Sequence, residues 1–186
     1  MISGLIIYNK IDRDKNQWFI DRCLSLLNNS EFSLSFLDED LLEDYLKNHH
    51  ADFAIYRSRN HELVSKMEKL GIKVFNNSLT NKTANDKYET YQCLTKLGIP
   101  CLESSLDIID ISSFPIVMKS VSGHGGQEVY LINSIDEQKE MLKKSQTKFI
   151  YQKYIKNSGD LRVYLLGEKL VSAVLRQNDN DFRSNY

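Results

Sequence analysis

The sequence predicts an α/β protein in two parts, a first half of alternating strands and helices and a second half built mainly from antiparallel strands. Up to about residue 77, short apolar runs rich in β-branched residues alternate with amphipathic segments of helical period. This order is typical of a parallel, Rossmann-like sheet. After about residue 100, apolar runs follow one another through short connections, as they do in hairpins.

Composition limits the class of protein before any motif is considered. The 186 residues are 41% apolar and can bury the core of one domain or of two small ones. Lys and Arg number 24 against 25 Asp and Glu, so no overall charge favours nucleic acid or an anionic membrane as a partner. No apolar run is long enough to span a bilayer, and no signal-peptide pattern opens the chain. The three cysteines form no C-x-x-C motif. We therefore expect a cytoplasmic protein.

The elements of the first half follow from their hydrophobic patterns. Strands are predicted where β-branched or alternating apolar residues cluster, at 4–8, 32–37, 53–56 and 72–75. Helices are predicted where apolar residues recur every three or four positions, at 17–27, 38–46 and 62–70. No glycine-rich turn follows the first strand, so this part is not expected to bind a dinucleotide by itself.

The second half begins after a polar bridge at residues 76–83. A helix is predicted from about residue 85 to 97, where Gly98 ends it and Pro100 prevents its continuation. A further helix is predicted at 136–144. Strands are predicted at 116–118, 128–132, 149–155, 161–166 and 169–175. Gly167 and Glu168 join the last two strands in a tight hairpin.

A glycine loop between two of these strands is the first candidate site. The strand at 116–118 leads into Lys119, and the loop runs from Ser122 through Gly123, His124 and Gly125 to Gly126. Glycines let backbone N–H groups approach an anion, and successive N–H groups of this kind form a concave phosphate site. The loop matches neither the P-loop nor the dinucleotide fingerprint. By itself it leaves two interpretations open, a flexible lid over nucleotide phosphates and an ordinary hairpin connection.

Several separate stretches, in order and at matching spacing, carry a resemblance to a known family. They are residues 85–92, residues 115–119 with the glycine loop, residues 150–155, the G-x-D-[IL]-R pattern at 158–163, and the R-x(n)-D-F-R-S-N pattern at 175–185. Together they resemble the ATP-grasp superfamily, and within it the RimK-type, glutathione-synthase-like carboxylate–amine ligases. The resemblance covers about residues 50–186 in detail and the preceding residues only in fold style.

The resemblance implies an ATP-grasp fold with a Rossmann-like pre-ATP-grasp domain at 1–77 and an ATP-grasp domain at 78–186. The glycine-loop lid would cover about 113–150, and the C-terminal subdomain would begin at 151–186. The implied activity uses ATP to phosphorylate a carboxylate, and an amine or amino acid then displaces phosphate to form an amide or peptide bond. The implied partners are ATP, a carboxylate substrate and an amine co-substrate.

The resemblance also implies roles for individual residues. The expected nucleotide contacts are Lys87, Lys119, Ser122, Gly123, Gly125, Gly126, Gln152, Lys153, Tyr154, Ile155, Asp160, Ser184 and Asn185. Arg176 and Arg183 are the expected catalytic residues, since paired Arg donors suit a carboxylate or acyl phosphate. Arg57 would face the substrate. For Gln152, Asp160 and Arg57, a surface or turn role stays open as an alternative, and a solvated loop position is the alternative to a phosphate contact for His124.

The sequence departs from the family at its C-terminal end, Tyr186. Family members continue beyond this point with the residues that hold Mg²⁺, and the present sequence offers no metal ligand that we can nominate. A ligase fragment, a truncated gene product and a module completed by a partner chain are therefore alternatives. The second functional hypothesis is a non-catalytic nucleotide-binding module. Missing strands would leave an exposed sheet edge, so homo-oligomer formation is a further hypothesis.

Overall fold

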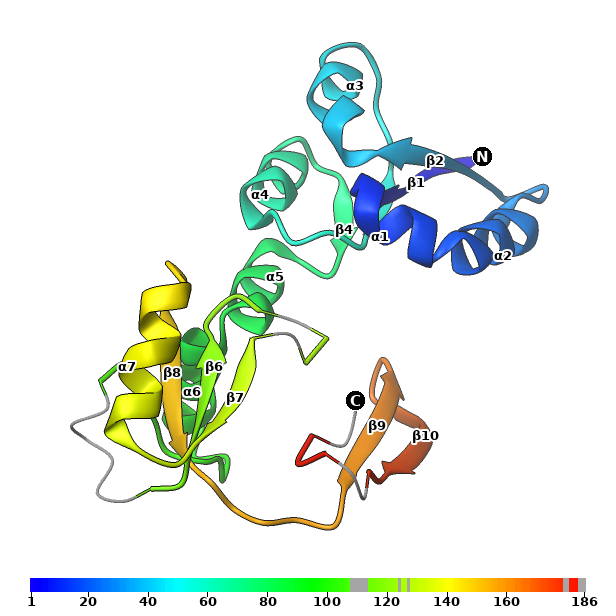
Figure 1. Ribbon diagram of the computed structural model, residues 1–186. Helices are drawn as coiled ribbons and strands as arrows, with labels where there is room; N and C mark the ends of the chain where they lie inside the picture. The colour runs from blue at the N-terminus through cyan, green and yellow to red at the C-terminus, as the bar shows by residue number, and fades with distance from the viewer. Residues whose placement is uncertain (108–113, 124, 127, 179–180, 184–186) are drawn as a thin grey trace. The chain divides into compact units, whose positions relative to one another are not determined.

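The computed structural model describes residues 1–107, 114–123, 125–126, 128–178 and 181–183. The chain divides into two units, Met1–Ala84 and Asn85–Tyr186. Both the parallel part and the antiparallel part that the sequence predicts are present (Figure 1).

The N-terminal unit is built on a four-stranded parallel sheet in the order β2-β1-β3-β4. Its strands are β1 (Ile2–Tyr8), β2 (Phe32–Asp38), β3 (Phe53–Tyr56) and β4 (Lys73–Phe75). Its helices are α1 (Lys10–Lys15), α2 (Gln17–Leu27), the 3-10 turn η1 (Glu39–Leu41), α3 (Leu42–Asn48), α4 (His61–Lys69) and α5 (Ser78–Asn85). The predicted Rossmann-like arrangement is confirmed.

Helices cover both faces of this sheet, because successive side chains of the central strand β1 point to opposite sides. Leu5 and Ile7 belong to a core formed with α3 and α4. Ile6 and Tyr8 belong to a second core, formed with α2 through Ile20. Burial on both faces explains the unbroken apolar run of β1 in the sequence.

The C-terminal unit contains two antiparallel sheets. One has four strands in the order β5-β8-β6-β7, and the other is the hairpin of β9 and β10. The strands are β5 (Ser104–Ser105), β6 (Ile116–Ser120), β7 (Val129–Ile132), β8 (Phe149–Lys153), β9 (Asp160–Leu166) and β10 (Lys169–Arg176), and the helices are α6 (Lys87–Lys96) and α7 (Ile135–Lys144). The predicted antiparallel pairing around the glycine loop and the hairpin at Gly167 are confirmed.

The two faces of the four-stranded sheet have different functions. Ile116 and Met118 of β6 are buried in a core against which Met141 of α7 packs. Val117 and Lys119 alternate with them and therefore point to the opposite face. The strand that supports the hydrophobic core thus also positions a lysine on the other side of the sheet.

The polar bridge expected at residues 76–83 is instead largely helical, because α5 begins at Ser78. The side chain of Asn77 accepts a hydrogen bond from the Thr80 backbone N–H at 2.8 Å, which satisfies one of the N–H groups left open at the helix start. Asn81 is buried, and its amide donates to the Ser58 carbonyl at 3.0 Å. The buried residue of this helix is polar, so the sequence lacks the apolar residues at every third or fourth position from which a helix is predicted.

Two other short elements, α1 and β5, were not predicted either. The side chain of Asn9 caps α1 by accepting from the Asp12 backbone N–H at 2.9 Å. Strand β5 has two residues and exists through its pairing with β8, so no sequence pattern announces it. No helix among the described residues is long and apolar enough to cross a membrane.

We predict that Ile7→Ala lowers the stability of the N-terminal unit by about 2–5 kcal/mol, because it opens a cavity in the core. The Ile7 side chain is 0% exposed, whereas that of Ile2, on the same strand, is 45% exposed. The matched control Ile2→Ala should therefore cost no more than about 1 kcal/mol. Native-state hydrogen exchange of the β1 amides measures both changes, and equal losses would contradict the burial argument.

Candidate functional site

A cavity of about 310 Å³ lies on the face of the four-stranded sheet that carries Val117 and Lys119. Residues from β6, β7 and β8, from the segment after β8, from β9 and β10 and from the C-terminal segment line it together. The lining residues are Leu102, Val117, Lys119, Val129, Gln152, Lys153, Tyr154, Ile155, Asn157, Asp160, Arg176, Phe182 and Arg183. Most of the predicted nucleotide and catalytic residues after the glycine loop are therefore in one place.

Lys119 is one of the charged residues that line this cavity. Its ammonium group donates to the side-chain oxygen of Gln152 at 2.6 Å. Burial lowers the pKa of Lys119, and the nearby charge of Lys87 lowers it further. A partly desolvated cation of this kind is poised to bind an anion, because an anionic ligand would relieve both effects.

Lys87 is the first residue of α6, and its side chain contacts the start of the glycine loop. Asp86 caps this helix, and its carboxylate accepts from the Tyr88 and Glu89 backbone N–H groups at 2.8 and 2.9 Å. The ammonium of Lys87 donates to the Ser120 carbonyl at 2.9 Å and also to the Gly123 carbonyl. Burial lowers the pKa of Lys87, while the carboxylates of Asp86 and Glu128 oppose that change.

The glycine loop connects β6 with β7, as predicted, and Ser122 lies in it. Gly125 and Gly126 have φ angles of 66° and 79°, in a region that residues other than glycine rarely adopt. The Gly123 N–H donates to the Ser120 hydroxyl at 3.1 Å. His124 lies outside the described residues. Within them, the loop is tied to its own strand and, through Gly126, to the C-terminal segment.

The two predicted catalytic arginines are both engaged in ion pairs. Arg176 donates from Nε and Nη2 to one carboxylate oxygen of Asp160, at 3.1 and 2.5 Å. Arg183 donates to the Asp181 carboxylate at 2.9 and 2.7 Å and to the Gly126 carbonyl at 3.1 Å. These contacts hold the pKa of Asp181 down to about 2. Asp160 and Arg176 form an ion pair with each other, so a ligand that contacts one of them would also affect the other.

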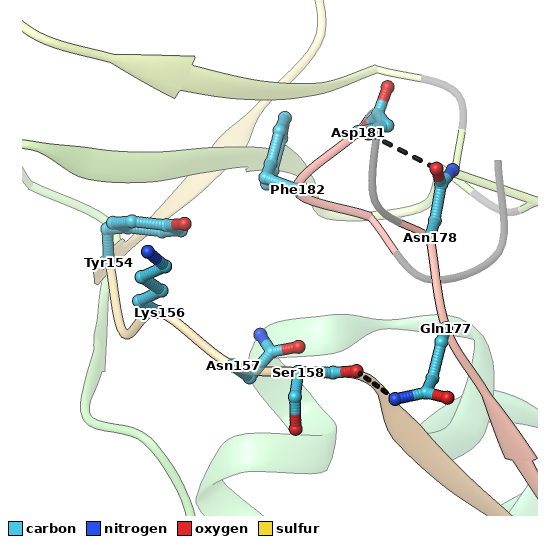
Figure 2. A pocket seen from close by; sticks show the side chains of 8 residues that line it. All are labelled: Tyr154, Lys156, Asn157, Ser158, Gln177, Asn178, Asp181 and Phe182. Atoms are coloured by element: carbon cyan, nitrogen blue, oxygen red, sulfur yellow. Dashed lines mark hydrogen bonds between the residues drawn. The ribbon is translucent and has the colours of Figure 1, made fainter.

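A second cavity, of about 650 Å³, shares Tyr154, Asn157 and Phe182 with the first (Figure 2). Its other lining residues are polar or charged, namely Lys156, Ser158, Gln177, Asn178 and Asp181. Figure 2 shows that these side chains come from the segment after β8 and the segment after β10, which the bond from the Gln177 amide to the Ser158 carbonyl joins at 3.1 Å. The first cavity therefore continues into a wider, polar one.

Not every predicted site residue lines the first cavity. Lys87 and the loop residues Ser122, Gly123, Gly125 and Gly126 are not among its lining residues. Ser184 and Asn185 lie outside the described residues. Arg57 belongs to the N-terminal unit, where its backbone N–H donates to the Ile7 carbonyl at 2.9 Å and its guanidinium lies 5.8 Å from the centre of the Phe19 ring. In the part of the chain that the structure describes, no group of three or more His, Cys, Asp or Glu residues could hold a metal ion.

Sequence reasoning missed several residues of the cavity. Val117 and Val129 could have been found from strand alternation, because they share a face with Lys119. Leu102 and Asn157 lie in irregular segments and carry no sequence signal. Ser104 does not line the cavity, but it accepts a hydrogen bond from the Gln152 amide at 2.6 Å and belongs to the two-residue strand β5. It could be found only from the strand pairing.

Residues 84–186 match the family described as the RimK-like ATP-grasp domain. The chain is 31% identical over 190 residues to the "Uncharacterized protein MG011 homolog" of Mycoplasma pneumoniae, covering 99% of this chain and 66% of the relative. It is 31% identical over 134 residues to a "Probable alpha-L-glutamate ligase" of Legionella pneumophila, covering 64% of this chain and 44% of that protein. The chain thus spans two thirds or less of the length of these relatives.

Among solved structures, the chain is similar to the ATP complex of D-alanine–D-alanine ligase from Bacillus anthracis. The TM-score is 0.74 at 18% sequence identity, and the match covers 98% of this chain and 68% of the ligase. At this level of identity the similarity shows the fold, which is the predicted ATP-grasp fold.

The low pKa of Asp181 leads to a prediction about pH. A carboxyl group with a depressed pKa stabilises the fold fully above the unfolded value of about 4, and this contribution is lost as the pH falls toward the folded value. In the unaltered chain we expect the Asp181 carboxyl carbon to titrate with a midpoint of about 2 in an NMR titration. Arg183→Gln should raise that midpoint, since the guanidinium donors and their charge disappear while the backbone N–H of residue 183 stays at 2.8 Å. Arg162→Gln, at an exposed position of β9, should leave it unchanged. An unshifted midpoint in Arg183→Gln would contradict the assignment.

Proposed function

The chain belongs to the family of RimK-like ATP-grasp domains, and we propose on this basis that it binds ATP for an ATP-dependent carboxylate–amine ligase. The observation that carries the proposal is the convergence of Lys119, Gln152, Asp160, Arg176 and Arg183 on one cavity. These residues come from distant parts of the sequence, and together they supply cations, an amide, a carboxylate and apolar neighbours. A phosphorylated nucleoside requires this combination of groups.

In the proposed complex, the phosphates lie near the ammonium groups of Lys87 and Lys119 and beneath the glycine loop. The N–H groups of Gly125 and Gly126 would add hydrogen bonds without a side chain in the way. The base lies beside the Gln152 amide and the main chain of Lys153 to Ile155. Because the Lys119 ammonium is 2.6 Å from the Gln152 oxygen, Lys119 would lie between the base and the nearest phosphate. Apolar walls from Val117, Val129 and Leu102 suit a flat ring.

The proposed reaction transfers the terminal phosphoryl group of ATP to a carboxylate and then joins that acid to an amine. A carboxylate oxygen attacks the γ-phosphorus and ADP leaves, after which the amine attacks the acyl carbon and phosphate leaves. Both steps concentrate negative charge on oxygen, which Arg176 and Arg183 would stabilise as donors of paired hydrogen bonds. The name of the Legionella relative refers to glutamate, and we propose an amino acid as the amine.

Mg²⁺ commonly neutralises charge between the β- and γ-phosphates in phosphoryl transfer. Magnesium prefers oxygen ligands, chiefly carboxylates and phosphates. The two carboxylates that line the cavities, those of Asp160 and Asp181, are already paired with Arg176 and Arg183.

We predict that Lys119→Ala weakens ATP binding by about 10- to 100-fold, the loss expected for a hydrogen bond to a charged group. Calorimetry with and without Mg²⁺ measures the dissociation constant. The control Lys139→Ala removes a lysine of α7 whose side chain is 63% exposed, and it should leave binding unchanged. Equal affinities of the unaltered chain and Lys119→Ala would contradict a phosphate site at this position.

Ligation itself requires a separate measurement. ADP release that depends on adding both a carboxylic acid and an amino acid, together with the amide product in a mass spectrum, would support the ligase. ATP binding without any such release, across a panel of acids and amines, would instead favour a non-catalytic nucleotide-binding module.

A further inference from the structure

We propose that the buried hydroxyl of Ser104 orients the Gln152 side-chain amide and thereby makes the site select a 6-amino purine over a 6-oxo purine. This inference rests on the proposed nucleotide site and extends it. It assigns a positioning role to a residue that has no contact with the cavity and carries no motif.

A chain of hydrogen bonds links Lys119, Gln152 and Ser104, and its direction is determined at both ends. The ammonium of Lys119 has only donors, so the atom of Gln152 that lies 2.6 Å away must be the amide oxygen. The amide nitrogen then donates to the Ser104 hydroxyl at 2.6 Å. That hydroxyl in turn donates to the Leu102 carbonyl, a pure acceptor, at 3.1 Å. Reversing the amide would place a donor against a donor at Lys119.

The sheet register brings these side chains together. Ser104 is the cross-strand partner of Gln152, and Gln152 is the partner of Val117 on β6. Lys119 follows Val117 by two positions on β6. Its side chain therefore points to the same face of the sheet as the side chains of Val117 and Gln152. Cross-strand and diagonal neighbours on one face lie within hydrogen-bonding reach when their side chains are long.

Burial makes Ser104 important to this arrangement. Its side chain is 5% exposed, so water has little access to the position its hydroxyl occupies. Without that hydroxyl, the amide nitrogen of Gln152 would lose its acceptor in a place where a replacement is hard to find. The Gln152 side chain would then be held at one end only, by Lys119, and could turn away from its present orientation.

The oxygen end of the amide is the end that a ligand meets. Lys119 and Gln152 both line the cavity, whereas Ser104 does not. An amide oxygen has two lone pairs, and Lys119 occupies one of them. The second can accept a hydrogen bond from a ligand, which suits the 6-amino group of adenine. Purines with oxygen at that position, such as guanine, present an acceptor there instead and would face an acceptor.

The test compares ATP with inosine triphosphate, which carries oxygen instead of the amino group at position 6 and, as a consequence, a proton on N1. Dissociation constants of both are measured by calorimetry for the unaltered chain and for Ser104→Ala, Ser104→Thr and Ser105→Ala. We expect Ser104→Ala to reduce the preference for ATP about two- to tenfold, the equivalent of one net hydrogen bond.

The other two variants separate orientation from folding. Ser104→Thr keeps the hydroxyl and should restore the preference. Ser105→Ala makes the same chemical change one residue along β5, where the hydroxyl accepts from the Asp107 backbone N–H at 2.9 Å, and it should leave the preference unchanged. If Ser104→Ala weakens both nucleotides equally, or leaves the ratio unchanged, the role in selectivity is wrong although the ATP site stands.

A second measurement separates this inference from the proposed function. If the unaltered chain binds neither nucleotide, the nucleotide site itself is wrong, and selectivity falls with it. The orienting contact is then tested without ligand, by NMR of the Gln152 side-chain amide protons. We expect a shifted, exchange-protected proton that is lost in Ser104→Ala and retained in Ser104→Thr. An unchanged amide signal in Ser104→Ala would overturn the orienting role.

Discussion

The half-buried ammonium of Lys119 is the constraint on which the candidate site depends. A charge removed from water must find a partner, and in this structure the partner is the side-chain oxygen of Gln152. That contact orients the amide, and the amide in turn engages Ser104 on the neighbouring strand. One desolvated cation thus organises the polar face of the sheet, while the opposite face carries the core around Ile116 and Met118.

The same principle applies to the other cations of the C-terminal unit. Lys87 is held by loop carbonyls, Arg176 by Asp160, and Arg183 by Asp181 and the Gly126 carbonyl. An anionic ligand would therefore exchange existing contacts for new ones, so its net affinity is smaller than the sum of the contacts it makes. The glycine loop is linked to Lys87 on one side and Arg183 on the other. Movement of the loop and rearrangement of these cations are for this reason coupled.

Sequence patterns predicted the sheets well where burial has a regular period. β1 is apolar and buried from Gly4 to Tyr8 because helices cover both faces of its sheet, and β6 is apolar from Ile116 to Met118 before it reaches Lys119. Hydrophobic patterns did not predict the elements that are held in place by polar contacts or by strand pairing. Helix α5 packs through Asn81, and β5 is defined by its partner strand alone. The candidate site shows the same division, since Lys119 was found from its strand and loop and Ser104 was missed.

The sequence by itself determined the order of strands and helices, the glycine loop and the position of Lys119 at the end of an apolar strand. These features depend on local spacing, which a linear pattern records. Only the tertiary structure decided that Asp160 pairs with Arg176, that Arg183 reaches Gly126, and that Ser104 lies beside Gln152. Those contacts join residues 16 to 57 positions apart. They arise from cross-strand register and from the course of the chain between strands, which no local pattern encodes.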